Sequence, residues 1–282
     1  MKILDGRQTS IKITQEIQKK VDKAISSGKR APRLDIILVG NDFASQKYVE
    51  MKSKKGQELG IRCEVHSFDE NISTEKLVEE ITKLNSDSQI DGIMVQLPLP
   101  KGIDEDLVLE SISPSKDVDG LTSINLGKLF KNDPTAIAPA TAKGILHLLH
   151  EYEIRIDGKK AVVIGRSDIV GLPTAAMLQN ENATITICHS HTNNLKEISK
   201  NADILVVGIG KGEYINSEYI KEGCTMIDVG TNRNAEGKLV GDVDFESVKE
   251  KVAYITPVPG GVGPMTIASL FSNLIDIYER NE

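Results

Sequence analysis

Short apolar runs recur along the whole chain and alternate with segments whose apolar residues have helical spacing. The clearest run, LDIILVG at 34–40, is continuous and ends in glycine, as expected for a strand buried on both faces of a parallel sheet. The segment 10–26 repeats apolar residues with the period of a helix. Strands that alternate with helices build a parallel sheet with helices on its faces, so the sequence predicts an α/β fold.

The first half of the chain contains three predicted strands and three predicted helices. The strands are 34–40, about 61–66 and 91–96, and the helices are 10–26, about 43–59 and about 73–85. Gly60 follows the second helix at the position where glycine commonly ends a helix.

The second half repeats the alternation with the spacing of a doubly wound nucleotide-binding sheet. The predicted strands are 159–165, 183–188, 203–208 and 225–230, with a fifth candidate at 252–256. A helix at about 141–152 should bridge the halves, and a last helix at about 265–279 should pack back on the first half. We therefore expect two domains, 1–139 with the C-terminal helix 263–282, and a Rossmann-like dinucleotide-binding domain at 140–262.

Composition narrows the class of protein. The chain carries 34 basic and 41 acidic side chains, a net charge of -7, which argues against nucleic-acid binding. No apolar run approaches the roughly 18 residues of a membrane span, and the N-terminus MKILDGRQTS lacks the apolar stretch of a signal peptide. Cys63, Cys188 and Cys224 have no C-x-x-C spacing, which favours reduced core thiols over disulfides or zinc ligands. We expect a cytoplasmic protein with no membrane partner and no bound metal.

The stretch VVIGRSDIVGLP at 162–173 has the features of a phosphate-binding turn. A predicted strand ends at Gly165, and a helix should begin near Val170. Gly165 and Gly171 lie one residue further apart than the outer glycines of G-x-G-x-x-G, but the turn still brings backbone N–H groups and a helix N-terminus towards a pyrophosphate. Two glycines at a strand–helix junction are often only a turn; their place at the first strand of the series favours nucleotide binding.

The residues after the second strand of this half indicate which nucleotide binds. Sites that prefer NAD usually have a carboxylate about 20 residues on, bonded to the ribose 2′-OH. Here the strand ends in CHSHT at 188–192, which contains no acid but offers Ser190, and Arg166 comes from the glycine turn. Arginine binds phosphate oxygens whereas a carboxylate repels them, so NADP is favoured over NAD. His189 and His191 could also be ordinary surface histidines at a strand end.

The helix at about 43–59 places a tyrosine and a lysine on one face. Ala44, Tyr48, Lys52, Lys55 and Leu59 recur at helical spacing, while the other lysines of the helix fall elsewhere and can be solvated. Lys52 on or beside this stripe has two interpretations. Its ammonium either extends along the surface to water or points into a cleft.

Three later segments favour the cleft. Gln96 ends a predicted strand just before Pro98, at the sheet edge where open α/β sheets bind ligands. Asp117 and Asp119 follow on the loop 114–121, where a single carboxylate could bond an amidine-like edge of a heterocycle. The glycine- and proline-rich loop TPVPGGVGPMT at 256–266 suits close backbone approach to a flat ring, although it could also be a rigid linker.

Taken in order, these features resemble the bifunctional methylenetetrahydrofolate dehydrogenase/methenyltetrahydrofolate cyclohydrolase family. The resemblance covers essentially the whole chain. Each motif alone is weak, but the ordered set is specific: Tyr48-x-x-x-Lys52, VQLPLP, KDVDG, GRSDIVGLP, CHSHT, IDVGTNR, GDVDF and TPVPGGVGPMT.

The resemblance implies two reactions in one cleft between a folate-binding domain and an NADP-binding domain. A hydride passes from 5,10-methylenetetrahydrofolate to NADP, and water then opens the methenyl ring to give 10-formyltetrahydrofolate. The implied catalytic residues are Lys52 as acid/base, Tyr48 against the folate and Gln96 beside Lys52; the implied substrate-binding residues are Asp119, Tyr48, Pro259, Gly260 and Gly261. The implied cofactor-binding residues are Thr141, Gly165, Arg166, Ser167, Gly171, Ser190 and Thr231. A homodimer is also implied.

The sequence departs from the family pattern at three places and leaves three rival interpretations. PATA at 139–142 lacks a cysteine that the family often has, Gly212 stands where proline is common, and Gly208 stands where alanine is usual. These departures bear on cofactor affinity rather than on reaction type. A short-chain dehydrogenase also uses Y-x-x-x-K, but there the pair follows the dinucleotide strands, and here it precedes them. A two-domain dehydrogenase of another small substrate gives no reason for Gln96, Asp119 and the glycine- and proline-rich loop together. The intact set of Tyr48, Lys52 and Gln96 argues against a nucleotide-binding homologue without turnover.

Overall fold

The computed structural model describes residues 1–281, and their contacts group the chain into two compact units. One unit, here the three-stranded unit, contains Lys12–Lys128, Thr135–Ala138 and the chain from Leu270 onward. The other, the six-stranded unit, contains Met1–Ile11, Leu129–Pro134 and Pro139–Ser269. The long helices α1 (Gly6–Ser26) and α10 (Val262–Asn281) contribute residues to both units.

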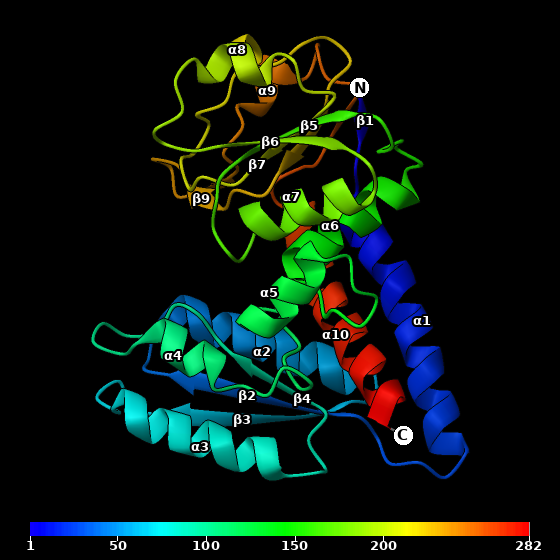
Figure 1. Ribbon diagram of the computed structural model, residues 1–282, viewed down its shortest axis with the longest axis vertical. Helices are drawn as coiled ribbons and strands as arrows, with labels where there is room; N and C mark the ends of the chain where they lie inside the picture. The colour runs from blue at the N-terminus through cyan, green and yellow to red at the C-terminus, as the bar shows by residue number, and fades with distance from the viewer. Residues whose placement is uncertain (282) are drawn as a thin grey trace. The chain divides into compact units, whose positions relative to one another are not determined.

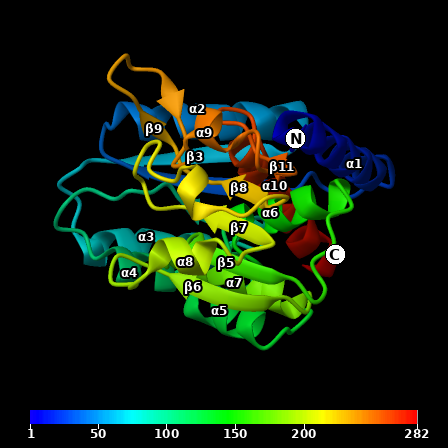
Figure 2. The ribbon, with the colours of Figure 1, turned by 90° about the horizontal axis from the view of Figure 1, so that it is seen from above.

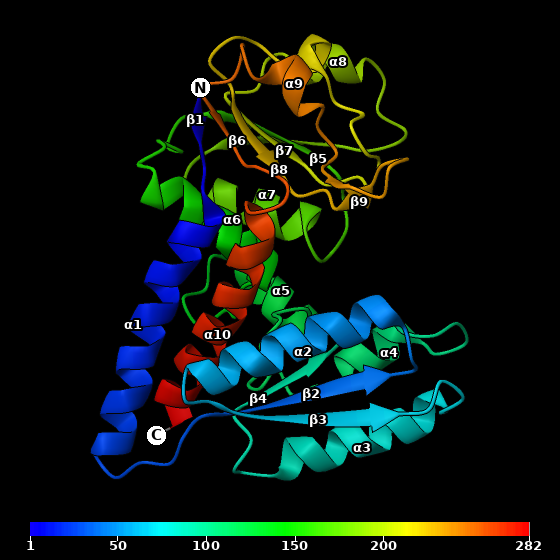
Figure 3. The same ribbon diagram turned by 180° about the vertical axis from the view of Figure 1, so that it is seen from behind.

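The three-stranded unit is built on a parallel sheet with the order β3-β2-β4. Its strands are β2 (Arg33–Val39), β3 (Arg62–Phe68) and β4 (Gly92–Val95). The helices that follow the strands are α2 (Phe43–Glu58), α3 (Thr74–Ser86) and α4 (Glu105–Glu110), and α5 (Ser123–Phe130) begins in the same unit. Figure 3 shows α2 and α3 on opposite faces of the sheet. Because β2 and β4 pair in parallel, their carboxyl ends meet at one edge of the sheet.

Apolar packing explains why β2 is central. Ile37 and Val39 of β2 share a buried cluster with Leu77 and Ile81 of α3 and with Val95 of β4. On the other face, a side chain at Gly92 would collide with Val118 and Leu274. A strand covered on both faces reads as a continuous apolar run, which is the pattern that predicted it.

The six-stranded unit is a parallel sheet with the order β1-β11-β8-β7-β5-β6. Figure 2 shows β6, β5, β7, β8 and β11 side by side in this order. The strands are β1 (Lys2–Ile3), β5 (Lys160–Ile164), β6 (Thr184–Cys188), β7 (Ile204–Val207), β8 (Thr225–Asp228) and β11 (Tyr254–Ile255). A separate antiparallel pair joins β9 (Asn232–Arg233) and β10 (Leu239–Val240).

Helices cover both faces of this sheet. In Figure 1, α6 (Ala140–Glu151) and α7 (Gly171–Asn180) lie on one side, and α8 (Leu195–Ser199) and α9 (Phe245–Val248) lie on the other. A 3₁₀ turn, η1 (Ser217–Tyr219), packs its Tyr219 into the same core as Val248 of α9. The two-domain α/β prediction, with a Rossmann-like second sheet, is confirmed.

The units differ from the expected domain ranges at their ends. Residues 1–11, placed by the prediction in the first domain, group with the six-stranded unit because β1 pairs in parallel with β11. The last helix begins at Val262, three residues before the expected start, and only its part from Leu270 onward groups with the three-stranded unit. The prediction missed the short helices α4 and α5. Each is too short to show a helical period in the sequence.

Two properties of the described residues bear on the class of protein. Within residues 1–281, every helix is too short or too polar to cross a bilayer. The three cysteines are free thiols, with Cys188 and Cys224 buried. Burial raises the pKa of the Cys63 and Cys224 thiols to about 12, so neither is a nucleophile near neutral pH.

Candidate active site and cofactor-binding residues

Lys52 and Gln96 meet at the carboxyl edge of the three-stranded sheet. Lys52 lies on α2, which follows β2, and Gln96 is the first residue after β4. The Lys52 Nζ donates to Gln96 Oε1 at 3.1 Å, and Gln96 Nε2 donates to the Leu97 carbonyl at 2.6 Å. The second bond fixes the amide, because only its nitrogen can donate to a carbonyl. A neutral acceptor therefore faces the lysine whether its amine is charged or not.

The face of α2 that packs inward is offset from the predicted one. Its buried residues are Ser45, Val49 and Gly56, whereas Tyr48 is 45% exposed and Met51 is 53% exposed. Lys52 and Tyr48 are one helical turn apart and share a face, as predicted. This face, however, lies at the margin of the buried side of α2, between the buried residues and solvent. A lysine on the margin keeps its stem against protein while its amine reaches the sheet edge.

The lysines of α2 separate into two kinds. Lys47 pairs with Glu50 and Lys55 pairs with Glu58, each within one helical turn and each largely in solvent. Lys52 instead bonds the neutral Gln96. Burial lowers the pKa of Lys52 below its ordinary value, and the charge of Asp119 opposes this shift. Lys52 therefore loses its proton more easily than an ordinary lysine does.

Asp119 and Asp117 have different roles although they are two residues apart. The Asp117 carboxylate is buried and accepts bonds from the backbone N–H groups of Gly120 and Thr122 and from Asn125 Nδ2, so it holds the loop together. Within residues 1–281, no hydrogen bond reaches the Asp119 carboxylate. Burial raises the pKa of Asp119 to about 6, opposed by the Lys52 charge. A partly buried carboxylate with unused acceptors is suited to bind the N–H groups of a ligand.

The glycine turn after β5 is shaped by close backbone contacts. Gly165 has a φ of +132°, and a Cβ on it would lie 2.4 Å from the Gly208 carbonyl oxygen. A Cβ on Gly171 would lie 2.3 Å from the Gly165 oxygen, so both positions require glycine. Val170 is the N-cap of α7 but makes no side-chain cap bond. The start of this helix is therefore left without a side-chain cap, and the predicted binding of a pyrophosphate there stays a prediction.

The side chains predicted to bind the cofactor are placed around this turn and the neighbouring strand end. Arg166 and Ser167 are exposed on the turn, and the Ser167 Oγ accepts from Val170 N–H at 3.3 Å. Ser190 is exposed after β6, where His189 accepts from His191 N–H. An exposed guanidinium and two exposed hydroxyls are groups that can bond phosphate oxygens, although the exposed Asp168 follows Ser167 in the same turn. The prediction that Arg166 and Ser190 bind the 2′-phosphate of NADP stays a prediction.

The remaining predicted ligand contacts also lie in the six-stranded unit. Thr141 is the second residue of α6, and its Oγ1 is 3.2 Å from Thr266 Oγ1. Thr231 is exposed after β8. Pro259 is exposed, whereas Gly260 and Gly261 are buried.

The glycine loop approaches the start of α1. Arg7 N–H donates to the Gly260 carbonyl at 3.2 Å, and a Cβ on Gly6 would lie 1.8 Å from the Gly261 oxygen. Backbone contacts with Gly6 and Arg7 thus hold the loop in place. A loop held in this way can present its backbone to a flat ligand.

Sequence reasoning missed two functional candidates, Asp228 and Asp242. They lie in the motifs IDVGTNR and GDVDF, and both side chains are buried in the six-stranded unit. An acid inside an apolar strand, as in TMIDVG, is the signal that could have found the first of them.

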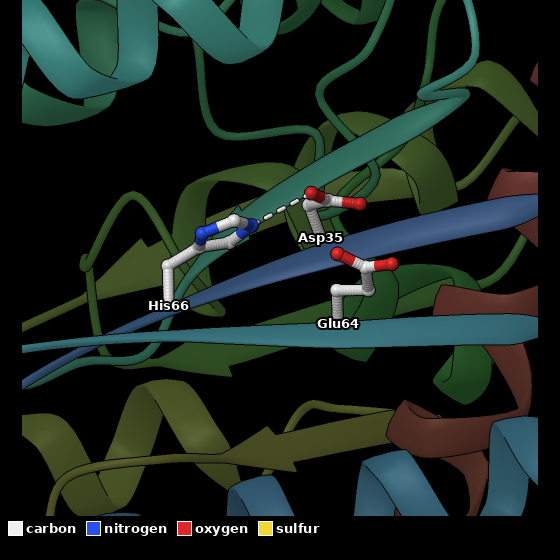
Figure 4. A group of neighbouring side chains, drawn as sticks. All are labelled: Asp35, Glu64 and His66. Carbon is white, nitrogen blue, oxygen red and sulfur yellow. Dashed lines mark hydrogen bonds and ion pairs between the residues drawn. The ribbon is translucent and has the colours of Figure 1, made fainter.

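A separate polar cluster lies on β2 and β3 of the three-stranded unit and consists of Asp35, Glu64 and His66. Figure 4 shows the His66 ring directed at Asp35, and the two are 2.7 Å apart. The three side chains could surround a cation. Arg33, however, donates to both oxygens of Asp35, at 2.7 and 2.9 Å, and to Glu64. The arginine already supplies the positive charge, so the group is interpreted as part of the fold.

This interpretation predicts a large loss of stability when Arg33 is replaced by methionine. Asp35 is fully buried, and the substitution would leave its charge without the guanidinium that compensates it. We expect the free energy of unfolding in urea to fall by about 3–5 kcal/mol. The matched control, Lys76→Met, removes the surface ion pairs of Lys76 with Glu79 and Glu80 on α3 and should cost less than about 1 kcal/mol. Equal losses in the two variants would contradict the structural role of Arg33.

The geometry can be compared with known proteins. A model of the tetrahydrofolate dehydrogenase/cyclohydrolase catalytic domain matches residues 4–119, and one of the NAD(P)-binding domain matches residues 139–282. The chain is 51% identical over 279 residues to the bifunctional protein FolD of Ligilactobacillus salivarius, covering 99% of this chain and 97% of that protein.

Solved structures of the same family resemble this chain along nearly its whole length. The chain is similar to the bifunctional enzyme FolD, methylenetetrahydrofolate dehydrogenase/cyclohydrolase, from Campylobacter jejuni, with a TM-score of 0.98, 46% identity and complete coverage of both chains. It is also similar to the Trypanosoma brucei methylenetetrahydrofolate dehydrogenase-cyclohydrolase complexed with NADP and an inhibitor, with a TM-score of 0.92, 38% identity, and coverage of 98% of this chain and 96% of that one. With both family domains matched in order over nearly the whole length, this chain belongs to the tetrahydrofolate dehydrogenase/cyclohydrolase family.

Proposed function

We propose that this chain oxidises 5,10-methylenetetrahydrofolate to the methenyl compound with NADP and then hydrolyses it to 10-formyltetrahydrofolate, as a bifunctional enzyme of one-carbon metabolism. The observation that carries the proposal is the bond from Lys52 to the neutral Gln96, with the lysine pKa lowered by burial. Relatives across the full length carry the name bifunctional protein FolD, which supports both activities.

The dehydrogenase step needs mainly placement. When bound, NADP supplies the hydride acceptor. Arg166 and Ser190 are the residues proposed to hold its 2′-phosphate, and the Gly165–Gly171 turn its pyrophosphate. Because the hydride leaves the methylene carbon directly, the protein's task is to orient the folate, and Asp119 and Tyr48 are the side chains proposed to do so. The methylene carbon thereby becomes a methenyl cation.

The cyclohydrolase step needs a base, and Lys52 fits this role. Water adds to the methenyl carbon while the neutral amine of Lys52 takes one of its protons. The bond from this carbon to N5 then breaks, N5 takes the remaining hydroxyl proton, and the proton held by Lys52 passes to solvent. A base with its pKa near the working pH is the most effective, and an ordinary lysine at 10.5 would be almost wholly protonated. Gln96 holds the amine in both charge states.

The two half-reactions test the proposal separately. Methenyltetrahydrofolate alone should lose its near-ultraviolet absorbance when the protein is added, at a rate proportional to protein. Methylenetetrahydrofolate should yield methenyl compound with NADP, and much less efficiently with NAD. A protein that binds NADP but accelerates neither conversion would refute the proposal. The homodimer and the cytoplasmic location implied by the resemblance stay predictions.

Asp119 gives the folate affinity a predicted pH dependence. The ionised carboxylate accepts bonds from the pterin edge, and because its pKa is raised to about 6, it gains a proton as the pH falls through 6. Between pH 7 and pH 5 the ionised fraction falls about tenfold, so the dissociation constant for folic acid should rise about tenfold. Calorimetric titration at each pH measures this. The variant Asp119→Asn should bind more weakly at pH 7 and show a flat profile; an unchanged slope would assign the pH dependence to another group.

A further inference from the structure

Two buried carboxylates, Asp228 and Asp242, lie in the six-stranded unit at the carboxyl end of its central strands. Asp228 ends β8, and Asp242 follows β10. They are 4% and 0% exposed, and no ion pair reaches either one within residues 1–281. Burying a carboxylate without a cation costs free energy unless N–H donors surround it. The donors that surround Asp228 and Asp242 therefore indicate the role of each carboxylate.

Asp242 accepts bonds from three consecutive backbone N–H groups of one loop. Its Oδ2 accepts from Ile209 at 2.6 Å and Gly210 at 3.0 Å, and its Oδ1 accepts from Lys211 at 2.7 Å. The same Oδ1 accepts from Asn232 Nδ2 at 2.9 Å, in the loop that follows β8. One carboxylate thus joins the loops that follow two neighbouring strands.

Asp228 holds Asp242 in place. Its Oδ1 accepts from the backbone N–H groups of Gly230 and Asp242, each at 2.9 Å, and its Oδ2 accepts from Val243 at 3.0 Å. Two glycines make the packing possible. A Cβ on Gly241 would lie 1.8 Å from an Asp228 oxygen, and one on Gly230 would lie 2.4 Å from the Asp242 carboxyl carbon.

The network continues to the phosphate turn on one side and to the glycine loop on the other. Gly208, at the head of the loop held by Asp242, is the residue whose carbonyl excludes a side chain at Gly165. Asp228 N–H donates to Thr256 Oγ1 at 2.7 Å, and Thr256 begins the loop that contains Gly261. The strands involved, β7, β8 and β11, are neighbours in the sheet (Figure 2).

We propose that Asp242, supported by Asp228, is a positioning residue for NADP: it fixes the loops 208–212 and 229–232 in the shape that receives the cofactor. The inference rests on the proposed function and adds a residue to it. The loop 208–212 contains glycine at positions 208, 210 and 212, and Ile209 is its one residue that packs against the core of the unit. The conformation of the glycine positions is therefore fixed mainly by the backbone bonds to Asp242. Thr231, a predicted cofactor contact, lies between Gly230 and Asn232, which are bonded to the two carboxylates.

The test is the variant Asp242→Asn in the full-length protein. Asparagine keeps the shape but turns an NH₂ group towards N–H donors, so two of the four bonds are lost. The dissociation constant for NADP, measured by calorimetry at pH 7.5, and the KM for NADP should each rise about tenfold. Hydrolysis of methenyltetrahydrofolate, which uses no NADP, should stay within about twofold of wild type. A purely structural role would instead lower the melting temperature and both activities together, with the NADP dissociation constant of the folded fraction unchanged.

A matched control and a milder variant keep the test decisive. Asp203→Asn changes a carboxylate at the amino edge of the same sheet, where Asp203 accepts from Lys160 N–H at 2.9 Å, and it should leave the NADP dissociation constant unchanged. If Asp242→Asn does not fold, Asn232→Ala removes one of the four bonds and should raise that constant about threefold. An unchanged constant in either folded variant overturns the inference. The role of Asp242 is tested by the dissociation constant for NADP and does not depend on turnover. A wild-type protein that binds NADP but shows no turnover would therefore refute the proposed function and leave this inference testable.

Discussion

Replacing Lys52 by methionine is expected to reduce cyclohydrolase turnover by about a thousandfold while the protein stays folded and binds NADP. Removing a positioned base costs on the order of 10²–10⁴ in rate. Methionine keeps most of the side-chain volume at the margin of α2, and the one bond lost is that to Gln96, worth about 1 kcal/mol. Since the predicted NADP contacts lie in the six-stranded unit, the dissociation constant for NADP should change less than twofold.

The neighbouring lysine provides the control for this variant. Lys54 lies on the same helix two residues away and is exposed, so Lys54→Met should retain full activity in both reactions. Circular dichroism and thermal unfolding should show both variants folded. Near-wild-type hydrolysis of methenyltetrahydrofolate by Lys52→Met would remove Lys52 from the mechanism and leave the base unassigned.

Replacing Arg166 by alanine is expected to raise the KM for NADP about thirtyfold and the KM for NAD less than twofold. The difference follows from the 2′-phosphate, which NAD lacks. Hydrogen bonds to a charged group contribute about 1.5–3 kcal/mol each, or roughly a 10- to 100-fold change in affinity. Initial rates of NADPH and NADH formation with saturating methylenetetrahydrofolate measure both constants.

A second arginine of the six-stranded unit separates local from general charge effects. Arg155 is exposed and pairs with Asp157, away from the glycine turn in sequence, and Arg155→Ala should change neither KM. If Arg166→Ala raises both constants equally, the arginine contacts a part that the two cofactors share, and the preference for NADP must be assigned to other residues such as Ser190.

Periodicity predicted the elements that bury a continuous apolar face. The strands β2, β5, β7 and β8 and the helix α2 lie within one or two residues of their expected bounds, because each is covered on both faces or is long enough to show its period. The contact of Lys52 with Gln96 followed from topology, since the carboxyl ends of adjacent parallel strands meet at one edge. Family resemblance, rather than spacing, favoured Asp119 over Asp117.

What the sequence could not predict depends on pairings between distant residues. The strand β1 has two residues and forms only because β11, some 250 residues later, offers it an edge, so no local pattern marks it. The same holds for Asp228 and Asp242, whose partners are mostly backbone N–H groups of other loops and leave no trace in side-chain periodicity. The inward face of α2 was misjudged because the helix buries a serine and a glycine there.

The stoichiometry of the complete reaction tests the central claim most directly. Purified wild-type protein is incubated with 5,10-methylenetetrahydrofolate and NADP, NADPH is followed by absorbance, and the folate products are identified by mass spectrometry. The account predicts one 10-formyltetrahydrofolate for each NADPH, with the methenyl compound only transient, and hydrolysis of the methenyl compound about a thousandfold slower than in wild type when Lys52 is methionine. NADPH formed with the methenyl compound as the end product, opening no faster than without enzyme, would contradict it.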